Sequence, residues 1–428
     1  MNIKIRLTLL NFLEFAVWGA YLTSMGGYLA SVGLGAQIGY FYSVQGFVSL
    51  IMPALMGIVA DRWIQAQRVL SMCHLIAGVM MLLASFYCLQ ASDDVEFSIL
   101  FGLYTISVAF FMPTIALANS VSYNALEKAN LDAVKAFPPI RVFGTIGFII
   151  SMWIVDLSGW QTTPYQFMWS GALSVLLSLY SLSMPKCEIA TRKENQSLVQ
   201  ALGLEAFSLF RNYRMALFFI FSMLLGCCLQ ITNGYAGPFL QSFGINPEYQ
   251  GTFGVEHANI LISLSQISET LCILLIPFCL SRFGIKKVML IAMLAWTFRF
   301  GFFSIGNPGD GVWLLVLSMI VYGIAFDFFN ISGSLFVDKE TDISIRNSAQ
   351  GLFMMMTNGF GASIGMIAAG WVMNLYTLNA SGLMIDKPGT GGWSQAWFIF
   401  TIYALAVAIL FSIMFRYKHT PANKKRFL

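Results

Sequence analysis

The chain has 428 residues, of which 57% are hydrophobic, 15% aromatic and only 10% charged, and its net charge is +4. A soluble domain carries about 25% charged residues, so this composition excludes a soluble enzyme and a nucleic-acid-binding domain. The chain must instead satisfy its surface with lipid, and its small net charge matters only through where the positive residues lie.

The seven cysteines and three histidines indicate neither a disulfide framework nor a metal site. The number of cysteines is odd, most of them lie in apolar runs, and no Cys or His spacing matches that of metal ligands. We therefore expect small core residues at these positions and no cofactor.

Apolar runs recur along the whole chain. A transmembrane helix needs about 20 mostly apolar residues, and dividing the sequence at its polar breaks gives twelve such segments. The first follows Lys4 and Arg6, as a signal peptide would, but it is long, contains Glu14 and lacks a clear cleavage site, so we interpret it as a retained helix. The predicted helices span residues 7–30, 36–60, 69–90, 97–122, 142–160, 164–184, 215–240, 257–280, 288–306, 311–336, 348–376 and 394–415.

The basic residues indicate how these helices are oriented. Cytoplasmic loops collect Lys and Arg. If the N-terminus is cytoplasmic, all but three of the 24 Lys and Arg residues fall on the cytoplasmic side, which includes the C-terminal tail. The exceptions are Lys387, in an external loop, and Arg141 and Arg299, which lie at or within helices. We therefore expect both termini in the cytoplasm.

The longest charged and weakly apolar stretch between predicted helices separates the first six from the last six. We expect an N-terminal six-helix bundle over residues 1–185, a cytoplasmic linker over 186–214, and a C-terminal six-helix bundle with a short tail over 215–428. The fold class is therefore an all-α integral membrane protein of two six-helix halves.

A basic turn recurs at the same place in each half, at residues 57–63 and 281–287. It resembles the signature loop of the major facilitator superfamily, whose halves rock around a midplane site. The match is partial, because the first copy lacks the internal glycine and the second lacks the aspartate. We expect Asp61, Arg62 and Arg282 to lock a cytoplasmic gate by pairing with neighbouring helix ends; the alternative is a plain solvated turn.

Five ionisable residues lie inside predicted helices, namely Glu14, Arg141, Glu269, Arg299 and Asp327. A charge at the bilayer centre costs at least about 2.5 to 3.5 kcal/mol, so such residues mark functional sites. Arg299 is expected to pair structurally or to reach an interface, whereas the role of Glu14 stays open.

Helical spacing places polar and aromatic neighbours on shared faces of four predicted helices. One such group is explained by hydrogen bonding between helices, but four of them near mid-depth indicate a binding site. The groups are Arg141, Thr145 and Phe148; Gln230 and Asn233; Gln266 and Glu269; and Tyr322, Phe326, Asp327 and Asn330.

The chemistry of these groups favours a neutral, flat and polyhydroxylated ligand. Amides on separate helices suit the edge of a heterocyclic base, a carboxylate accepts hydrogen bonds from sugar hydroxyls, and aromatic rings offer stacking. Because Arg141 opposes Glu269 and Asp327, the site has no large excess of one charge. Asp327 is the best candidate for proton coupling through a changing contact with Arg141, and Glu269 is the alternative.

Literal sequence patterns extend around these residues, over 112–117, 137–145, 229–233, 265–270, 322–334 and 348–351. They resemble the bacterial nucleoside:proton symporter family, from the first predicted helix to the twelfth. The resemblance implies a multi-pass protein of the bacterial inner membrane that imports purine and pyrimidine nucleosides with protons. It also implies that the central site is lined by Arg141, Thr145, Phe148, Gln230, Asn233, Gln266, Glu269, Tyr322, Phe326 and Asp327.

Two other functions stay open. One is a proton symporter for another neutral polyhydroxylated solute, such as a sugar, and the other is a nucleoside sensor that does not transport. We expect a sensor to carry a signalling domain, which this chain does not show, and an intramembrane enzyme to carry paired catalytic groups. The expected partners are nucleosides, protons and lipid, with no nucleic acid, and we expect a monomer.

Overall fold

The computed structural model describes residues 2–92, 94–187, 204–342, 345–380, 382–387 and 389–417. Most of the predicted linker, at 188–203, and the predicted tail, at 418–428, lie outside the described residues. Within the described ranges the chain is helical, and its only β pairing is an isolated bridge between Leu378 and Met384. The boundaries of the linker therefore stay a prediction.

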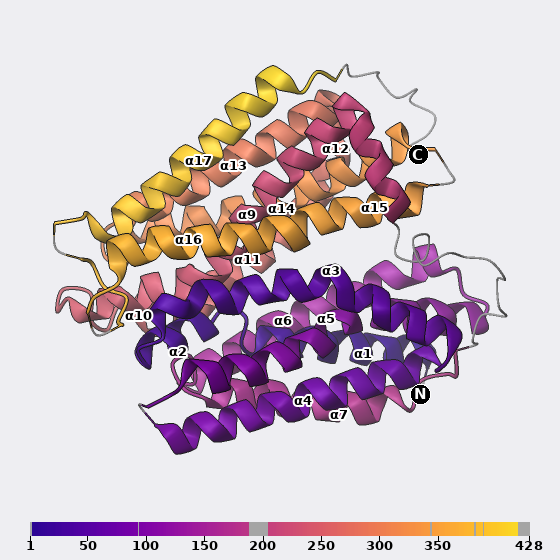
Figure 1. Ribbon diagram of the computed structural model, residues 1–428, viewed down its shortest axis with the longest axis horizontal. Helices are drawn as coiled ribbons and strands as arrows, with labels where there is room; N and C mark the ends of the chain where they lie inside the picture. Colours follow the sequence, from indigo (N-terminus) through magenta and orange to yellow (C-terminus); the bar gives the residue numbers. More distant parts are fainter. Residues whose placement is uncertain are drawn as a thin grey trace.

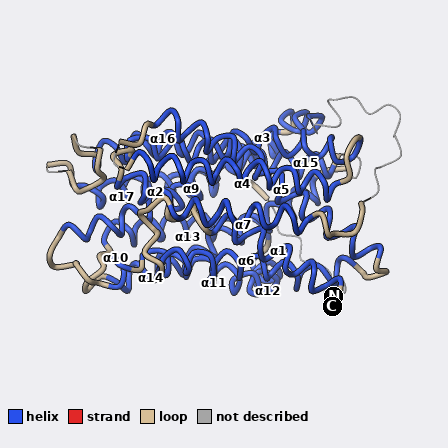
Figure 2. The backbone as a smooth tube through the Cα atoms, turned by 90° about the horizontal axis from the view of Figure 1, so that it is seen from below, coloured by secondary structure: helices blue, strands red, loops and turns tan. Residues whose placement is uncertain are grey.

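The N-terminal half covers the described residues up to 187 and lies in the lower part of Figure 1. Its helices run along the long axis of the molecule, with loops gathered at the two ends (Figure 2). Its elements are α1 (Ile3–Gly19), α2 (Met25–Ser31), η1 (Gly35–Gln37), α3 (Ile38–Arg62), α4 (Ala66–Ala91), α5 (Phe97–Lys128), α6 (Ala133–Leu157) and α7 (Tyr165–Ser181).

The C-terminal half covers the described residues from 204 and lies in the upper part of Figure 1. Its long helices are α9 (Tyr213–Ser242), α11 (Ala258–Cys272), α13 (Ile285–Ile305), α14 (Val312–Glu340), α16 (Ala362–Thr377) and α17 (Gly392–Met414). Its shorter elements are η2 (Leu204–Arg211), η3 (Phe243–Ile245), α10 (Phe253–Glu256), η4 (Ile273–Leu275), α12 (Ile276–Phe283), α15 (Arg346–Met354) and the π-helical η5 (Met355–Gly361).

Every predicted span is found in helical structure. In the described part of the chain, 10 helices are long and apolar enough to cross a membrane. The remaining two predicted spans are the α1–α2 segment, which is broken at residues 20–24, and α7, which has 17 residues. The eighth span comprises α11, η4 and α12, and the eleventh comprises α15, η5 and α16.

The fifth helix begins earlier than the sequence predicts. The prediction starts it at residue 142, beyond Pro138 and Pro139, whereas α6 begins at Ala133. Proline removes a backbone donor and usually ends a helix, but membrane helices tolerate it because neighbouring groups satisfy the freed carbonyls. Arg141 therefore lies inside α6 rather than at its start.

The two halves touch along one part of their length. α1 begins and α17 ends at the end of the molecule that we call the terminal end, and the distal end is opposite (Figure 1). Across the halves, α6 packs on α11, α2 on α9, and α3 on α16. Hydrogen bonds between the two halves lie in the distal part of the molecule, such as that from Ser363 to the carbonyl of Ser43 at 3.1 Å and that from Asn374 to the carbonyl of Ala36 at 3.1 Å.

Close packing of α1 on α6 depends on Gly147, and this contact is testable. A Cβ at Gly147 would overlap the backbone of Phe12, so Gly147→Ala should destabilise the protein by about 1–3 kcal/mol. The measurement is the melting temperature in detergent.

Gly102→Ala on α5 is the matched control, because no atom lies within 4 Å of the added carbon. It should leave the melting temperature unchanged or raise it, since alanine favours a helix over glycine by roughly 0.5–1 kcal/mol. Equal melting temperatures for the two variants would contradict the packing assigned to Gly147.

Candidate functional site

The predicted polar faces lie on four helices, α11 and three that pack on it. α6 of the N-terminal half packs on α11, and α11 packs on both α9 and α14 within the C-terminal half. Arg141, Thr145 and Phe148 therefore approach from one half, and the other predicted residues approach from the opposite half. Phe148 is buried against the Trp18 ring, with the two centroids 6.3 Å apart.

An aromatic pair on α14 is held from behind by a buried arginine. The rings of Tyr322 and Phe326 are stacked, with centroids 5.7 Å apart and planes within 5°. Arg299 on α13 lies 4.6 Å from the centre of the Tyr322 ring and donates to the carbonyl of Ser318 at 2.8 Å. These contacts support the structural role expected of Arg299, and Phe326 itself is partly buried.

The predicted amides lie on α9 and α11, which pack on each other. Asn233 donates from Nδ2 to Oε1 of Gln230 at 3.2 Å, as their spacing on α9 predicts. Gln266 on α11 has its Oε1 buried with no hydrogen-bond partner among the described residues. Phe326 and Asn330 line a small cavity whose other walls include Leu229 of α9. An unpartnered buried oxygen costs free energy unless a ligand or water donates to it.

Three charged groups meet where the halves face each other. Arg141 is partly buried, and its guanidinium lies over the Phe15 ring, 3.8 Å from the ring centre. The charge of Arg141 interacts with that of Glu269 across the interface between the halves. No salt bridge within the described residues includes Arg141, Glu269 or Asp327.

The candidate proton carrier Asp327 is buried and feels the charge of Glu269. Its side chain is 6% exposed, and its Oδ2 has no hydrogen-bond partner in the described part of the chain. The charge of Glu269 repels that of Asp327. The predicted change of contact between Asp327 and Arg141 during the cycle stays a prediction.

A buried carboxylate closes the distal end. Asp156, at the end of α6, accepts hydrogen bonds through Oδ2 from the backbone N–H groups of Asn259 and Ile260 at 3.0 and 3.2 Å. Its Oδ1 lies 2.6 Å from Nδ1 of His257. Gln161 of the same half donates to the carbonyl of Glu256 at 2.9 Å. The N-terminus of α11 is thus capped by an anion from the other half, where the helix dipole favours negative charge.

The residues predicted to form a gate lie at the opposite, terminal end. Asp61, Arg62 and Arg282 are exposed, and none of them forms an ion pair with another described residue. Ion pairs at this end join Arg214 to Glu340 and Arg346 to Asp338, each at 3.1 Å within the C-terminal half, and Lys135 to Asp132 at 3.9 Å within the N-terminal half. The gate role of the first three residues stays a prediction.

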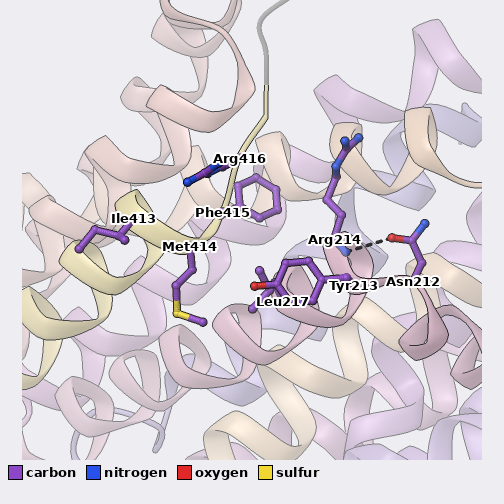
Figure 3. A pocket seen from close by; sticks show the side chains of 8 residues that line it. All are labelled: Asn212, Tyr213, Arg214, Leu217, Ile413, Met414, Phe415 and Arg416. Carbon is purple, nitrogen blue, oxygen red and sulfur yellow. Dashed lines mark hydrogen bonds between the residues drawn. The ribbon is translucent and has the colours of Figure 1, made fainter.

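A surface pocket at the terminal end is separate from the central site. It lies between the start of α9 and the end of α17, and Figure 3 shows Arg214 and Arg416 on its rim. Asn212 caps α9 there by accepting from the backbone N–H of Arg214 at 3.0 Å. None of the predicted binding residues lines this pocket.

Sequence reasoning missed the part played by Asp156 and His257. The sequence patterns above single out neither Asp156 nor His257 as a functional residue. One signal was present: α11 begins after Glu256 and His257, without Ser, Thr, Asp or Asn at the residue before its first turn. A helix start without a side-chain cap needs an acceptor from elsewhere.

The whole chain matches a known family. The family model described as "Nucleoside H+ symporter" matches residues 1–420. The chain belongs to the nucleoside H+ symporter family.

Its similarity to members of this family is high over the full length. The chain is 47% identical to the xanthosine permease of Escherichia coli, over 99% of each chain. It is 48% identical to the nucleoside permease NupG of the same organism, over 98% of this chain and 97% of that one. A crystal structure of the nucleoside transporter NupG superposes with a TM-score of 0.88 at 48% identity, covering 98% of this chain and 100% of that one.

More distant structures share the fold. A bacterial homologue of the human lysosomal transporter Spinster superposes with a TM-score of 0.69 at 14% identity, over 97% of this chain and 96% of that one. The predicted all-α membrane fold of the major facilitator type, with two six-helix halves, is confirmed. This member of the nucleoside H+ symporter family is a transporter and not an enzyme.

The Asp156 cap should control opening at the distal end. Asp156→Asn keeps the shape of the side chain but removes the charge that faces His257 and the start of α11. Since an anion at a helix N-terminus contributes up to about 2 kcal/mol, the amides of residues 258–262 should exchange with deuterium several-fold faster, as measured by mass spectrometry.

Glu96→Gln is the control, because Glu96 is an exposed carboxylate before α5 that forms no ion pair with another described residue. Unchanged exchange at residues 258–262 in Asp156→Asn would show that the cap does not hold the two halves together.

Proposed function

We propose that this transporter imports purine and pyrimidine nucleosides with protons and binds each nucleoside at mid-depth between its two halves. The observation that carries this proposal is the meeting of amides, an aromatic pair and opposed charges at one place on the interface of the halves. Such a set can recognise a base and a sugar together, without requiring a charged ligand.

Each group has a distinct part in binding. The face of Phe326, backed by Tyr322, stacks on the base, while Gln230 and Asn233 form hydrogen bonds with its edge. Gln266 offers an unpartnered oxygen to a donor on the ligand. Glu269 accepts from the ribose hydroxyls, and Arg141, Thr145 and Phe148 contact the ligand from the other half.

Contacts from both halves couple binding to movement. We place the terminal end in the cytoplasm, because Lys and Arg gather there. With the distal end closed by Asp156 and the contacts between the halves confined to the distal part, the structure is an inward-facing conformation of an alternating-access cycle. Asp61, Arg62 and Arg282 would pair when the cytoplasmic end closes.

Proton coupling is assigned to the adjacent carboxylates. Asp327 is buried with an unpartnered oxygen, beside Glu269, and Glu269 faces Arg141. Glu269 also contacts the substrate in this scheme, so nucleoside binding and proton binding change the same electrostatic environment. We assign the moving proton to Asp327 and the link to substrate to Glu269.

Uptake into proteoliposomes tests the proposed function. With an inward proton gradient, labelled uridine should accumulate above its external concentration, a protonophore should abolish this accumulation, and unlabelled nucleosides should compete. Competition by sugars but not by nucleosides would favour the sugar symporter, and saturable binding without uptake would favour the sensor.

Replacing the proposed proton carrier should separate coupling from exchange. Asp327→Asn should reduce gradient-driven accumulation of uridine to the equilibrium level, because the amide cannot release a proton, while exchange of internal for external uridine continues. Asp310→Asn, in the exposed loop before α14, is the control and should accumulate normally. Wild-type accumulation by Asp327→Asn would remove Asp327 from the coupling role.

Removing the stacking ring should weaken binding. Stacking of a base on an aromatic side chain contributes about 1–3 kcal/mol, so Phe326→Ala should raise the Kd for uridine roughly ten- to hundred-fold, as measured by calorimetry. Phe298→Ala, at a ring on α13 that is 58% exposed, should leave the Kd unchanged. Equal affinities in the two variants would show that the base does not stack on Phe326.

A further inference from the structure

A second buried acid–base pair lies within the N-terminal half. Glu14 on α1 and His74 on α4 are 1% and 0% exposed, and Nε2 of His74 lies 2.8 Å from Oε2 of Glu14. The hydroxyl of Thr114 on α5 lies 2.6 Å from Oε1 of Glu14 and 2.6 Å from the carbonyl of Phe111. Oγ of Ser174 on α7 lies 3.1 Å from Nδ1 of His74, the other nitrogen of the imidazole. The pair and its contacts thus come from four helices, α1, α4, α5 and α7.

The hydrogen-bond pattern shows that this pair holds a proton. The hydroxyl of Ser174 donates its single hydrogen to the carbonyl of His74 at 2.9 Å, so Nδ1 of His74 must donate to Ser174 Oγ. Nδ1 then carries a hydrogen, and the 2.8 Å contact between Nε2 and the carboxyl of Glu14 requires another hydrogen between them. With the Thr114 hydroxyl donating to Glu14, the pair is either a carboxylic acid beside a neutral imidazole or a carboxylate beside an imidazolium.

Loss of that hydrogen would change the charge of the pair from zero to −1. The imidazole would keep its bond to Ser174, and Glu14 would become a carboxylate facing a nitrogen lone pair. A buried charge of this kind needs a cation nearby. The other titratable or charged groups that face the pair, within the described part of the chain, are Cys73 on α4 and Arg141 on α6.

Arg141 connects this pair to the central site. Its guanidinium lies over the ring of Phe15, the residue next to Glu14, at 3.8 Å from the ring centre. Its charge interacts with both Glu14 and Glu269. A negative charge on Glu14 would therefore attract Arg141 away from Glu269, where the substrate is proposed to bind.

We propose that Glu14 and His74 form a second proton-binding site of the transport cycle, which acts on the substrate site through Arg141. This inference rests on the proposed function. With the proton bound, the pair is neutral and Arg141 faces Glu269; when the proton leaves to water, Glu14 is a carboxylate and Arg141 moves toward it. The N-terminal half thereby responds to proton binding, as the C-terminal half does through Asp327.

Two readouts in proteoliposomes distinguish a proton site from a packing contact. Glu14→Gln should lose about tenfold or more of the gradient-driven accumulation of uridine and should move fewer protons per uridine, as measured with an internal pH dye. Exchange of uridine at equal pH on both sides should continue within about twofold, because exchange needs no net proton release. Glu14→Asp, which keeps a titratable carboxyl, should restore part of the accumulation.

The matched control is Ser71→Ala. Ser71 contacts Ser178 at 3.1 Å, one turn from the contact of His74 with Ser174 and between the same two helices, but it contains no titratable group. This variant should keep both the accumulation and the proton count. An equal loss in Ser71→Ala, or a wild-type proton count in Glu14→Gln, would overturn the proposal.

A second variant covers the case in which Glu14→Gln does not fold. If Glu14→Gln does not fold, His74→Gln provides the same readouts, and failure of both variants beside a folded Ser71→Ala would show that the pair is only a structural clamp. If the wild-type protein accumulates no nucleoside, the proposed function itself is wrong. If the wild type and Glu14→Gln both transport uridine with the same number of protons, only the proposal of a second proton-binding site is wrong.

Discussion

A charge inside a bilayer needs a partner, and the arrangement of this transporter follows from how each buried charge finds one. Lipid offers no hydrogen bonds, so an ionisable group must be paired, neutralised or turned toward a cavity. Glu14 is paired with His74 inside one half. Asp156 is satisfied by His257 and by the start of α11 across the two halves. Within the described part of the chain Arg141, Glu269 and Asp327 form no salt bridge with one another, and they belong to the substrate site that we propose.

The contacts that satisfy these buried charges differ in how easily they break, and this difference suits an alternating-access cycle. The contacts of Glu14 lie within one half, so they persist while the halves move as rigid bodies. The cap that Asp156 places on α11 crosses the interface, and the side chain of His257 is 34% exposed, so water can replace these contacts when the distal end opens. The central charges can be satisfied by ligand and proton, which makes the closure of the halves depend on both.

Local sequence patterns predicted much of the fold and the site. Hydropathy located the predicted spans because each membrane helix must satisfy its own backbone. Contacts within one turn followed from helical spacing, such as the hydrogen bond of Asn233 to Gln230 and the stacking of Phe326 on Tyr322. The start of α6 was not predicted, because Pro138 and Pro139 appeared to end a helix that in fact continues through them.

Contacts between distant segments could not be predicted in the same way. His74 is 60 residues from Glu14, and His257 is 101 residues from Asp156. Helical periodicity identifies the face of a side chain but not the helix that will pack on it. For the same reason, the contact of Asp327 with Arg141 that the sequence suggests stays a prediction.

The central claim is that a nucleoside binds at mid-depth with contacts to both halves. A structure determined by electron cryomicroscopy at saturating uridine tests it most directly. The account predicts density for the base against Phe326, with the ribose near Glu269 and with Arg141 in contact from the opposite half. Density that touches only one half, or that lies in the surface pocket beside Arg214 and Arg416, would contradict it.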